Sequence, residues 1–359
     1  MDPIRTGGFI VSLFISFTIT GCGGSGGGGD DNDGNGDVVG SGSPEVVGSV
    51  DLPASGSGVA VSGGYAYVAA GNEGLQVVDV ADKSAPAIVA EIDTIFAAGG
   101  MQFFTAVMRQ FLYMAGGIEG VHVVEVTNPL LPALQATVGT AGNTSDVAYP
   151  AVPVGSQPLC AADGPTGVQV FPAAGGSVTV PTPEPTVGAA VSGDFCFVTG
   201  GTDLGGGAPA LYVIDMTNPA AAVLAQTLPL GGSPSGIETA GGFAYVTAGD
   251  PGMYVIDIGT PASPAIAGQT GALSTTGPIA VDAVRMRAYL GTTDTVGFPD
   301  DGLKVVDISS PGSPTVVATT DLPDWTGGVT VLDGYVYATT FAPLGGATSQ
   351  LHIVDVSTF

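Results

Sequence analysis

The acidic residues are the groups in this sequence best suited to chemistry. The chain of 359 residues has 32 Asp and Glu against six Lys and Arg and two His. Some of the acids recur at one place, each closing a short apolar run: Asp79, Glu125, Asp215, Asp257, Asp307 and Asp355. Such acids commonly accept backbone N–H bonds in the turn that follows. We therefore predict that they form turns and are not catalysts.

The two histidines offer little for catalysis. His122 and His352 occupy the same position in the recurring run, where Gln76, Tyr212 and Tyr254 stand in other copies. Equivalent positions of two repeats do not converge, so neither a Ser-His-Asp group nor a histidine metal site has a place to form. Whether the chain is an enzyme stays open here, but its residues favour a protein without catalytic activity.

One segment has the spacing that opens a calcium loop. Asp31, Asp33 and Asn35, followed by Gly36, could direct alternate oxygens at one ion. The Glu expected at the twelfth position is missing, because Gly42 stands there. Linker chemistry explains the segment, so no cofactor is predicted firmly and calcium is the one candidate.

The net charge restricts the partners. A formal charge of −26 at pH 7 repels nucleic acid phosphates and anionic lipid headgroups. We predict no nucleic-acid partner and expect a well-solvated monomer.

The recurring run defines the fold. Its copies are LQVVD at 75–79, VHVVE at 121–125, LYVID at 211–215, MYVID at 253–257, LKVVD at 303–307 and LHIVD at 351–355. A degenerate copy lies at 159–171, where Pro172 takes the place of the acid. In the first copy, strands are expected at 58–61, 65–69, 75–80 and 87–92. Four antiparallel strands repeated seven times, about 40–50 residues apart, predict an all-β, seven-bladed β-propeller.

The two ends of the chain predict how the ring closes. The last copy stops at Phe359, just after its third strand, and so lacks a fourth. The segment 43–53 matches 313–323, which contains the fourth strand of the preceding copy. We therefore expect the N-terminal strand to complete the last blade, beside 351–356, and to cover an otherwise open strand edge.

The first 42 residues point to export. Arg5 and an apolar segment at 9–18 have the form of a secretory signal and are too short to span a membrane. The ending Ile19-Thr20-Gly21-Cys22 resembles the lipobox of bacterial lipoproteins, which implies lipidation of Cys22. We expect a signal peptide at 1–21, a Gly/Asp-rich linker at 22–42 and the propeller at 43–359. The lipid would be the only contact with the membrane.

The repeats resemble those of a known family. The LQVVD, LYVID, MYVID, LKVVD and LHIVD runs, preceded by strands such as 65–68 and 243–246, are similar to those of LVIVD-repeat proteins. The resemblance covers 43–359 and departs most in the third copy. It implies a propeller on a bacterial or archaeal surface, and it brings no catalytic residues.

The variable connections predict a binding face. In a propeller, the connections from strand two to three and from strand four to the next blade open on one face, and here these are the long ones. The turns of the other face are expected to stay short. The candidate binding residues on the variable face are Asp203, Asp294, Phe298, Asp300, Asp301, Trp325, Phe341, Phe103 and Phe104. Carboxylates beside aromatic rings could hold a cation or a sugar.

Two cysteines remain after Cys22. Alignment places Cys160 where Tyr67 stands and Cys196 where Ala66 stands, on opposite faces of neighbouring second strands. A disulfide is compatible with export, but sheets pack about 10 Å apart, so two separate buried thiols are favoured.

These features predict a lipid-anchored scaffold of the cell envelope, at the outer membrane or cell surface, that binds protein or glycan without catalysis. One alternative is a calcium-assisted hydrolase or lyase that uses loop carboxylates. Another is a structural envelope protein without a specific ligand. The ligand, and whether the protein faces the periplasm or the exterior, are not encoded in any motif.

Overall fold

The computed structural model describes residues 43–93, 100–106, 109–150, 158–201, 207–273, 277–292, 302–341 and 348–359, without the side chains of 102–109. The expected signal peptide and linker, with Cys22, Asp31, Asp33 and Asn35, lie outside these residues. No helix in the described part of the chain has the length and apolar character needed to cross a bilayer.

The described residues form seven antiparallel sheets of four strands, which confirms the all-β propeller prediction. Blade one consists of β2 (Gly58–Ser62), β3 (Tyr65–Ala69), β4 (Leu75–Asp79) and β5 (Ala87–Ile92), and blade two of β6 (Met101–Ala106), β7 (Arg109–Ala115), β8 (Val121–Glu125) and β9 (Ala133–Val138). Blade three consists of β10 (Asp146–Ala148), β11 (Leu159–Ala162), β12 (Val168–Phe171) and β13 (Val178–Val180). Blade four consists of β14 (Thr186–Ser192), β15 (Phe195–Gly200), β16 (Ala210–Asp215) and β17 (Val223–Pro229). Blades five to seven are β18 (Ile237–Ala240), β19 (Phe243–Thr247), β20 (Met253–Asp257), β21 (Ala265–Gln269); β22 (Ile279–Asp282), β23 (Arg287–Gly291), β24 (Leu303–Asp307), β25 (Thr315–Thr320); β26 (Trp325–Leu332), β27 (Tyr335–Phe341), β28 (Gln350–Asp355) and β1 (Glu45–Asp51).

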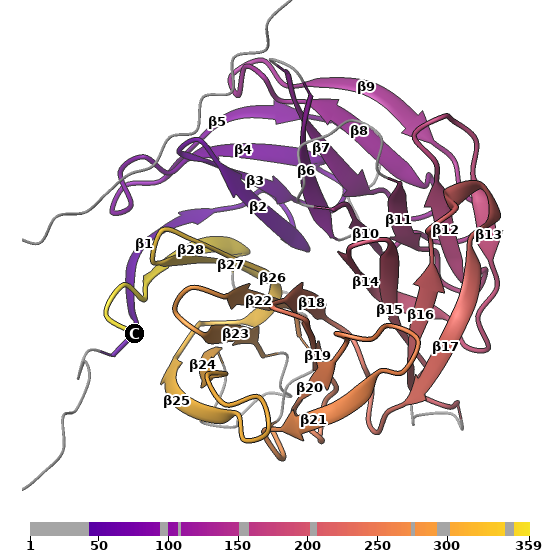
Figure 1. The fold of residues 1–359 in the computed structure, drawn as a ribbon. Helices are drawn as coiled ribbons and strands as arrows, with labels where there is room; N and C mark the ends of the chain where they lie inside the picture. Colours follow the sequence, from indigo (N-terminus) through magenta and orange to yellow (C-terminus); the bar gives the residue numbers. More distant parts are fainter. Residues whose placement is uncertain are drawn as a thin grey trace, which may run out of the picture. The chain divides into compact units, whose positions relative to one another are not determined.

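The blades form a closed ring. Each innermost strand contacts the next, from β2 through β6, β10, β14, β18, β22 and β26 back to β2. The last blade is completed as expected, because β1 pairs antiparallel with β28, from Glu45 opposite Asp355 to Asp51 opposite Gln350 (Figure 1). The two ends of the ring are therefore joined by backbone hydrogen bonds.

The turn after β4 in blade one reinforces this closure. The Lys83 ammonium lies 5.5 Å from the ring centre of Tyr335 and 5.9 Å from that of Tyr337, both in blade seven. A cation over an aromatic face contributes about 0.5–1 kcal/mol at exposed sites. Val47 and Val50 of β1 pack against the core shared by blades seven and one.

Five of the six recurring acids form the predicted turn bonds. The Oδ1 of Asp79, Asp215, Asp257, Asp307 and Asp355 each accepts the backbone N–H two residues on, at 2.8 to 2.9 Å. In the first four of these, the bond opens the turn between the third and fourth strands. The connections 80–86, 126–132, 216–222, 258–264 and 308–314 accordingly have one length.

In five of the seven blades a buried aromatic residue of the second strand fills the interface with the next blade. Tyr67, Phe197, Tyr245, Tyr289 and Tyr337 take equivalent places in their second strands, and all are buried. Blade three has Cys160 there instead.

The favoured prediction of two separate thiols is wrong. Cys160 forms a disulfide with Cys196 of blade four, with the Cα atoms 6.4 Å apart. Elsewhere the aromatic side chain meets a neighbour such as Ala66 or Ala288 within one core. At the interface of blades three and four, the disulfide takes the place of this contact between an aromatic residue and alanine.

The distribution of long connections is largely as expected, with two corrections. The long connections 201–209, 292–302 and 342–349 join second to third strands. However, residues 149–158 form a long connection on the opposite face, between β10 and β11. Phe103 and Phe104 were expected in a connection, but they lie within β6, the innermost strand of blade two.

Candidate functional site

The innermost strands surround a central channel of about 790 Å³. At the variable face small residues lie just before these strands or near their start, and those that line the entrance are Ser57, Gly58, Gly100, Ser145, Gly188, Ser235, Gly236, Gly277, Gly327 and Gly328. Further in, the wall consists largely of Val, Ile and Ala. The entrance therefore presents backbone and hydroxyl groups more than large side chains.

The glycines follow from how closely the innermost strands approach one another. A Cβ at Gly327 would lie 2.0 Å from the carbonyl oxygen of Gly56, and one at Gly188 would lie 2.3 Å from that of Ser235. Both oxygens belong to the chain that enters the next blade. Any side chain there would push neighbouring blades apart, so glycine is needed for the ring to close.

Two of the candidate binding residues, Trp325 and Phe341, lie together, and Phe341 belongs to the channel wall. Trp325 opens β26 and Phe341 ends β27, directly opposite each other in the strand pair. Their ring centres are 6.0 Å apart in an edge-to-face arrangement, and Phe341 also lines the channel. An aromatic pair of this kind contributes about 0.5–1.5 kcal/mol and holds both rings in place.

The other candidates are not placed beside this pair. Asp203, Asp294, Phe298, Asp300 and Asp301 lie outside the described residues. The backbone of Phe103 and Phe104 is in β6, and nothing is known of their side chains.

Two carboxyl groups that the repeat pattern does not single out, Asp146 and Glu238, lie in the channel wall. Asp146 Oδ2 accepts the N–H of Ala189 at 2.9 Å, and Glu238 Oε2 accepts that of Val281 at 2.7 Å. Each carboxyl thus joins its blade to the next. Burial raises the pKa of Asp146 to about 7 and that of Glu238 to about 7. An acid within a strand that is otherwise small or apolar was the available signal.

These two carboxyl groups should make stability depend on pH. Their pKa values lie above those of an unfolded chain, so the folded state holds more protons between about pH 4 and pH 7, and their contribution falls as the pH rises through that window. Burial lowers the pKa of His352 to about 4, which acts in the opposite direction. We therefore compare the native chain with the double variant Asp146→Asn, Glu238→Gln.

The free energy of unfolding is measured with denaturant for both chains at pH 5 and at pH 8. Between these two pH values, the stability of the double variant relative to the native chain should rise by at least about 1 kcal/mol. A constant difference across this range would show that neither carboxyl titrates there.

The two histidines lie in different blades and each is bonded within its own blade. His122 Nδ1 lies 3.0 Å from Thr137 Oγ1 in blade two, and His352 Nε2 lies 3.1 Å from Thr340 Oγ1 in blade seven. Each histidine thus contacts the strand beside it. Among the described residues, no three His, Cys, Asp or Glu side chains are grouped so that they could hold a metal ion.

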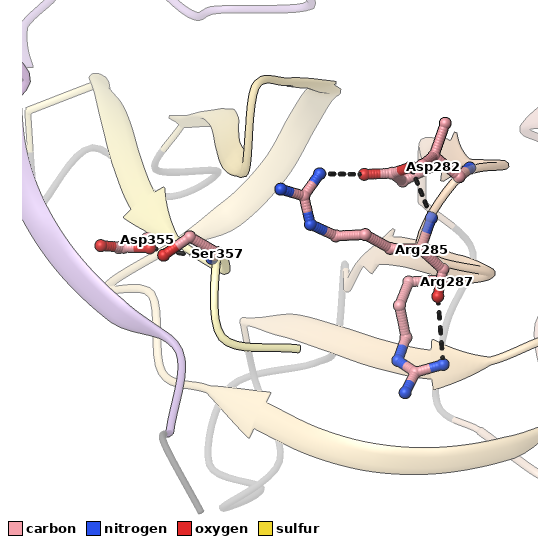
Figure 2. A network of polar contacts seen from close by, with 6 residues as sticks. Asp282, Arg285, Arg287, Asp355 and Ser357 are labelled. Carbon is pink, nitrogen blue, oxygen red and sulfur yellow. Dashed lines mark hydrogen bonds and ion pairs between the residues drawn. The ribbon is translucent and has the colours of Figure 1, made fainter. Parts of the chain in front are cut away.

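Two arginines lie at the opposite face, in and next to the β22–β23 turn. Arg285 contacts Asp282 at 2.8 Å, as Figure 2 shows, and Arg287 lies 3.1 Å from Asp307. Both side chains are therefore engaged with acids of their own blade.

The comparisons with known proteins agree with this fold. A model of the LVIVD repeat matches residues 55–94, 231–270 and 295–321, so the chain carries LVIVD repeats in its first, fifth and sixth blades. No curated protein matches the chain.

Several solved structures share the fold. The β-propeller domain of Cps50 (Swd1) from Myceliophteria thermophila is 12% identical, with a TM-score of 0.67 over 87% of this chain and 99% of that one. A chain of a mitotic checkpoint complex is 12% identical, with a TM-score of 0.64 over 96% and 99%. The computationally designed Ika8 protein is 11% identical, with a TM-score of 0.57 over 86% and 99%. At such identities the likeness establishes a propeller and carries no function with it.

Proposed function

We propose that this protein is an exported, lipid-anchored scaffold of the bacterial cell envelope, which binds a protein or glycan at the channel entrance without catalysing a reaction. The observation that carries the proposal is the entrance itself. It combines backbone and hydroxyl groups with the Trp325–Phe341 pair. Aromatic anchors beside hydrogen-bonding groups are typical of recognition surfaces.

Two observations support the location. The Cys160–Cys196 disulfide suits an oxidising compartment outside the cytoplasm, and the segment before Cys22 has the form of a lipoprotein signal. Labelling cells that express the full chain with radioactive palmitate tests the anchor. The native chain should be labelled and Cys22→Ser should not, whereas equal labelling of both would refute lipidation at Cys22.

The alternative of a calcium-assisted hydrolase or lyase depends on carboxylates of the connections, and its candidates Asp203, Asp294, Asp300 and Asp301 lie outside the described residues. The carboxyl groups of the channel wall lend it no support, because Asp146 and Glu238 belong to blades three and five and are each bonded to a different backbone N–H. General acid–base catalysis needs such groups within reach of one reacting bond.

The binding proposal can be tested with residues 43–359, which contain all seven blades and the closing strand. This fragment is applied to glycan arrays and used in pull-downs from envelope extracts, and each ligand found is titrated. The double variant Trp325→Ala, Phe341→Ala should bind at least roughly tenfold more weakly, as expected when aromatic anchors are truncated.

The matched control is Val284→Ala. Val284 is 92% exposed in the β22–β23 turn, on the opposite face, and the change should leave affinity unaltered. Equal weakening by both variants, or turnover of the bound ligand by the native fragment, would contradict the proposal.

A further inference from the structure

The interface between blades two and three differs from the other interfaces of the ring. Tyr113 takes the place that Tyr67, Tyr245 and Tyr289 take elsewhere, but those three are buried and Tyr113 is half-buried. Among the described residues, the buried core at this interface is also smaller than that of any other, with Ala115, Val121, Val147, Leu159 and Ala161. The described side chains of the two blades therefore pack less completely here.

A cavity of about 390 Å³ occupies the space left open. Its aromatic walls are Tyr113, Tyr149 and Phe171, and the rings of the two tyrosines are stacked with centres 5.7 Å apart. The rest of the described lining consists of Val121, Val123, Val138, Leu159, Pro172, Ala173, Gly175 and Gly176. None of these residues carries a charged side chain.

The degenerate third repeat explains the cavity. Its third strand ends in Phe171 and Pro172, where other copies have an acid that organises the next turn. Positions for a Cβ on Gly175 and Gly176 of that turn meet nothing within 4 Å. In blade six the corresponding turn packs closely on the outer strand of blade five, where a Cβ on Gly268 would lie 2.4 Å from Pro311 O.

The outer strand of blade two is correspondingly uncovered. All six residues of β9 are exposed, among them Leu134 at 43% and Val138 at 39%. The turn of blade three therefore does not cover this strand, and the cavity lies next to the rim of the ring.

We propose that this cavity binds a small, neutral, flat apolar molecule, such as an aromatic compound. Aromatic walls favour a flat partner, and the volume falls within the range of ligand pockets. Anions would be repelled by the net charge of −26, and the described lining offers no carboxylate to a cation. The site is separate from the channel entrance, although Tyr149 lines both spaces.

Tyr113 stays neutral at physiological pH. Burial, and next the nearby Tyr149, raise the pKa of Tyr113 above its ordinary value near 10. Because Tyr113 gains no charge between pH 6 and pH 8, binding of a neutral ligand should not depend on pH in this range.

The neutral fluorescent probe N-phenyl-1-naphthylamine tests the proposal with residues 43–359. The native fragment should bind one equivalent saturably, with a rise in probe fluorescence. Ala173→Phe should weaken binding at least roughly tenfold, because it places a ring at the wall of the cavity. The matched control is Ala174→Phe, an equally exposed neighbour that does not line the cavity and should bind as the native fragment does.

A second pair guards against a local folding defect in that turn. Val138→Phe, at the cavity, should also weaken binding, whereas Val317→Phe, at 46% exposure on the outer strand β25, should not. The absence of saturable binding by the native fragment would overturn the proposal. Unchanged affinity in both Ala173→Phe and Val138→Phe would overturn it too, since the probe would then occupy the channel or another surface.

Discussion

A fragment that begins at residue 52 should lose most of its stability, whereas one that begins at residue 43 should keep it. Without β1, the edge of β28 is open and the core residues Tyr337, Leu351 and Ile353 lose Val47 and Val50 as neighbours. We expect a loss on the order of 5 kcal/mol, comparable to the whole stability of a small domain. Denaturant midpoints and size-exclusion profiles of the two fragments measure this effect.

A synthetic peptide of residues 43–53 provides the control for the shortened fragment. If closure through β1 is what stabilises the ring, the added peptide should raise the midpoint and reduce aggregation. Equal midpoints for the two fragments, without peptide, would show that β1 does not close the ring.

Removal of the disulfide should have the next largest effect. The Cys160–Cys196 bond joins blades three and four across 36 positions of sequence, and loss of such a link costs roughly 2–4 kcal/mol. The double variant Cys160→Ala, Cys196→Ala should therefore melt roughly 4–8 °C lower. Calorimetry of the oxidised native fragment and the variant measures the difference.

The other interfaces suggest a rescue variant. Cys160→Tyr with Cys196→Ala recreates the pairing of Tyr245 with Ala288 and should recover part of the lost stability. Two freely titrating thiols in the native fragment, with a melting temperature that reducing agent leaves unchanged, would contradict the bridge.

The repeats made the fold predictable. Apolar runs closed by Asp79, Asp257 or Asp355 set the third strands and their turns, and the match between 43–53 and 313–323 indicated the closure. These features are local and periodic, so they can be read along the chain without knowledge of distances.

The disulfide was not predictable in this way. Alignment correctly placed Cys160 and Cys196 on facing sides of adjacent blades, but the average spacing of packed sheets argued against a bond. The approach of the Cα atoms to 6.4 Å is a property of this point of the interface, which the average does not describe.

The candidate site was predicted only in part. Trp325 and Phe341 meet because they end paired strands, which follows from the repeat. The carboxyl groups of Asp146 and Glu238 were not predictable from the repeat, because each is specific to one innermost strand and its partner N–H lies in the next blade. The cavity at Tyr113 depends on how the irregular third copy packs, and no periodic signal encodes that packing.

Strand β1 closes the ring, and the channel and its entrance exist only in a closed ring. Cysteine cross-linking between Asp51→Cys and Gln350→Cys tests this closure most directly, since Gln350 Nε2 lies 2.7 Å from Asp51 Oδ1. Mild oxidation of residues 43–359 should give a near-complete bond within one chain, while the control pair Asp51→Cys, Gln269→Cys should give none. Absence of the first bond, or its formation only between two chains, would contradict the closed ring.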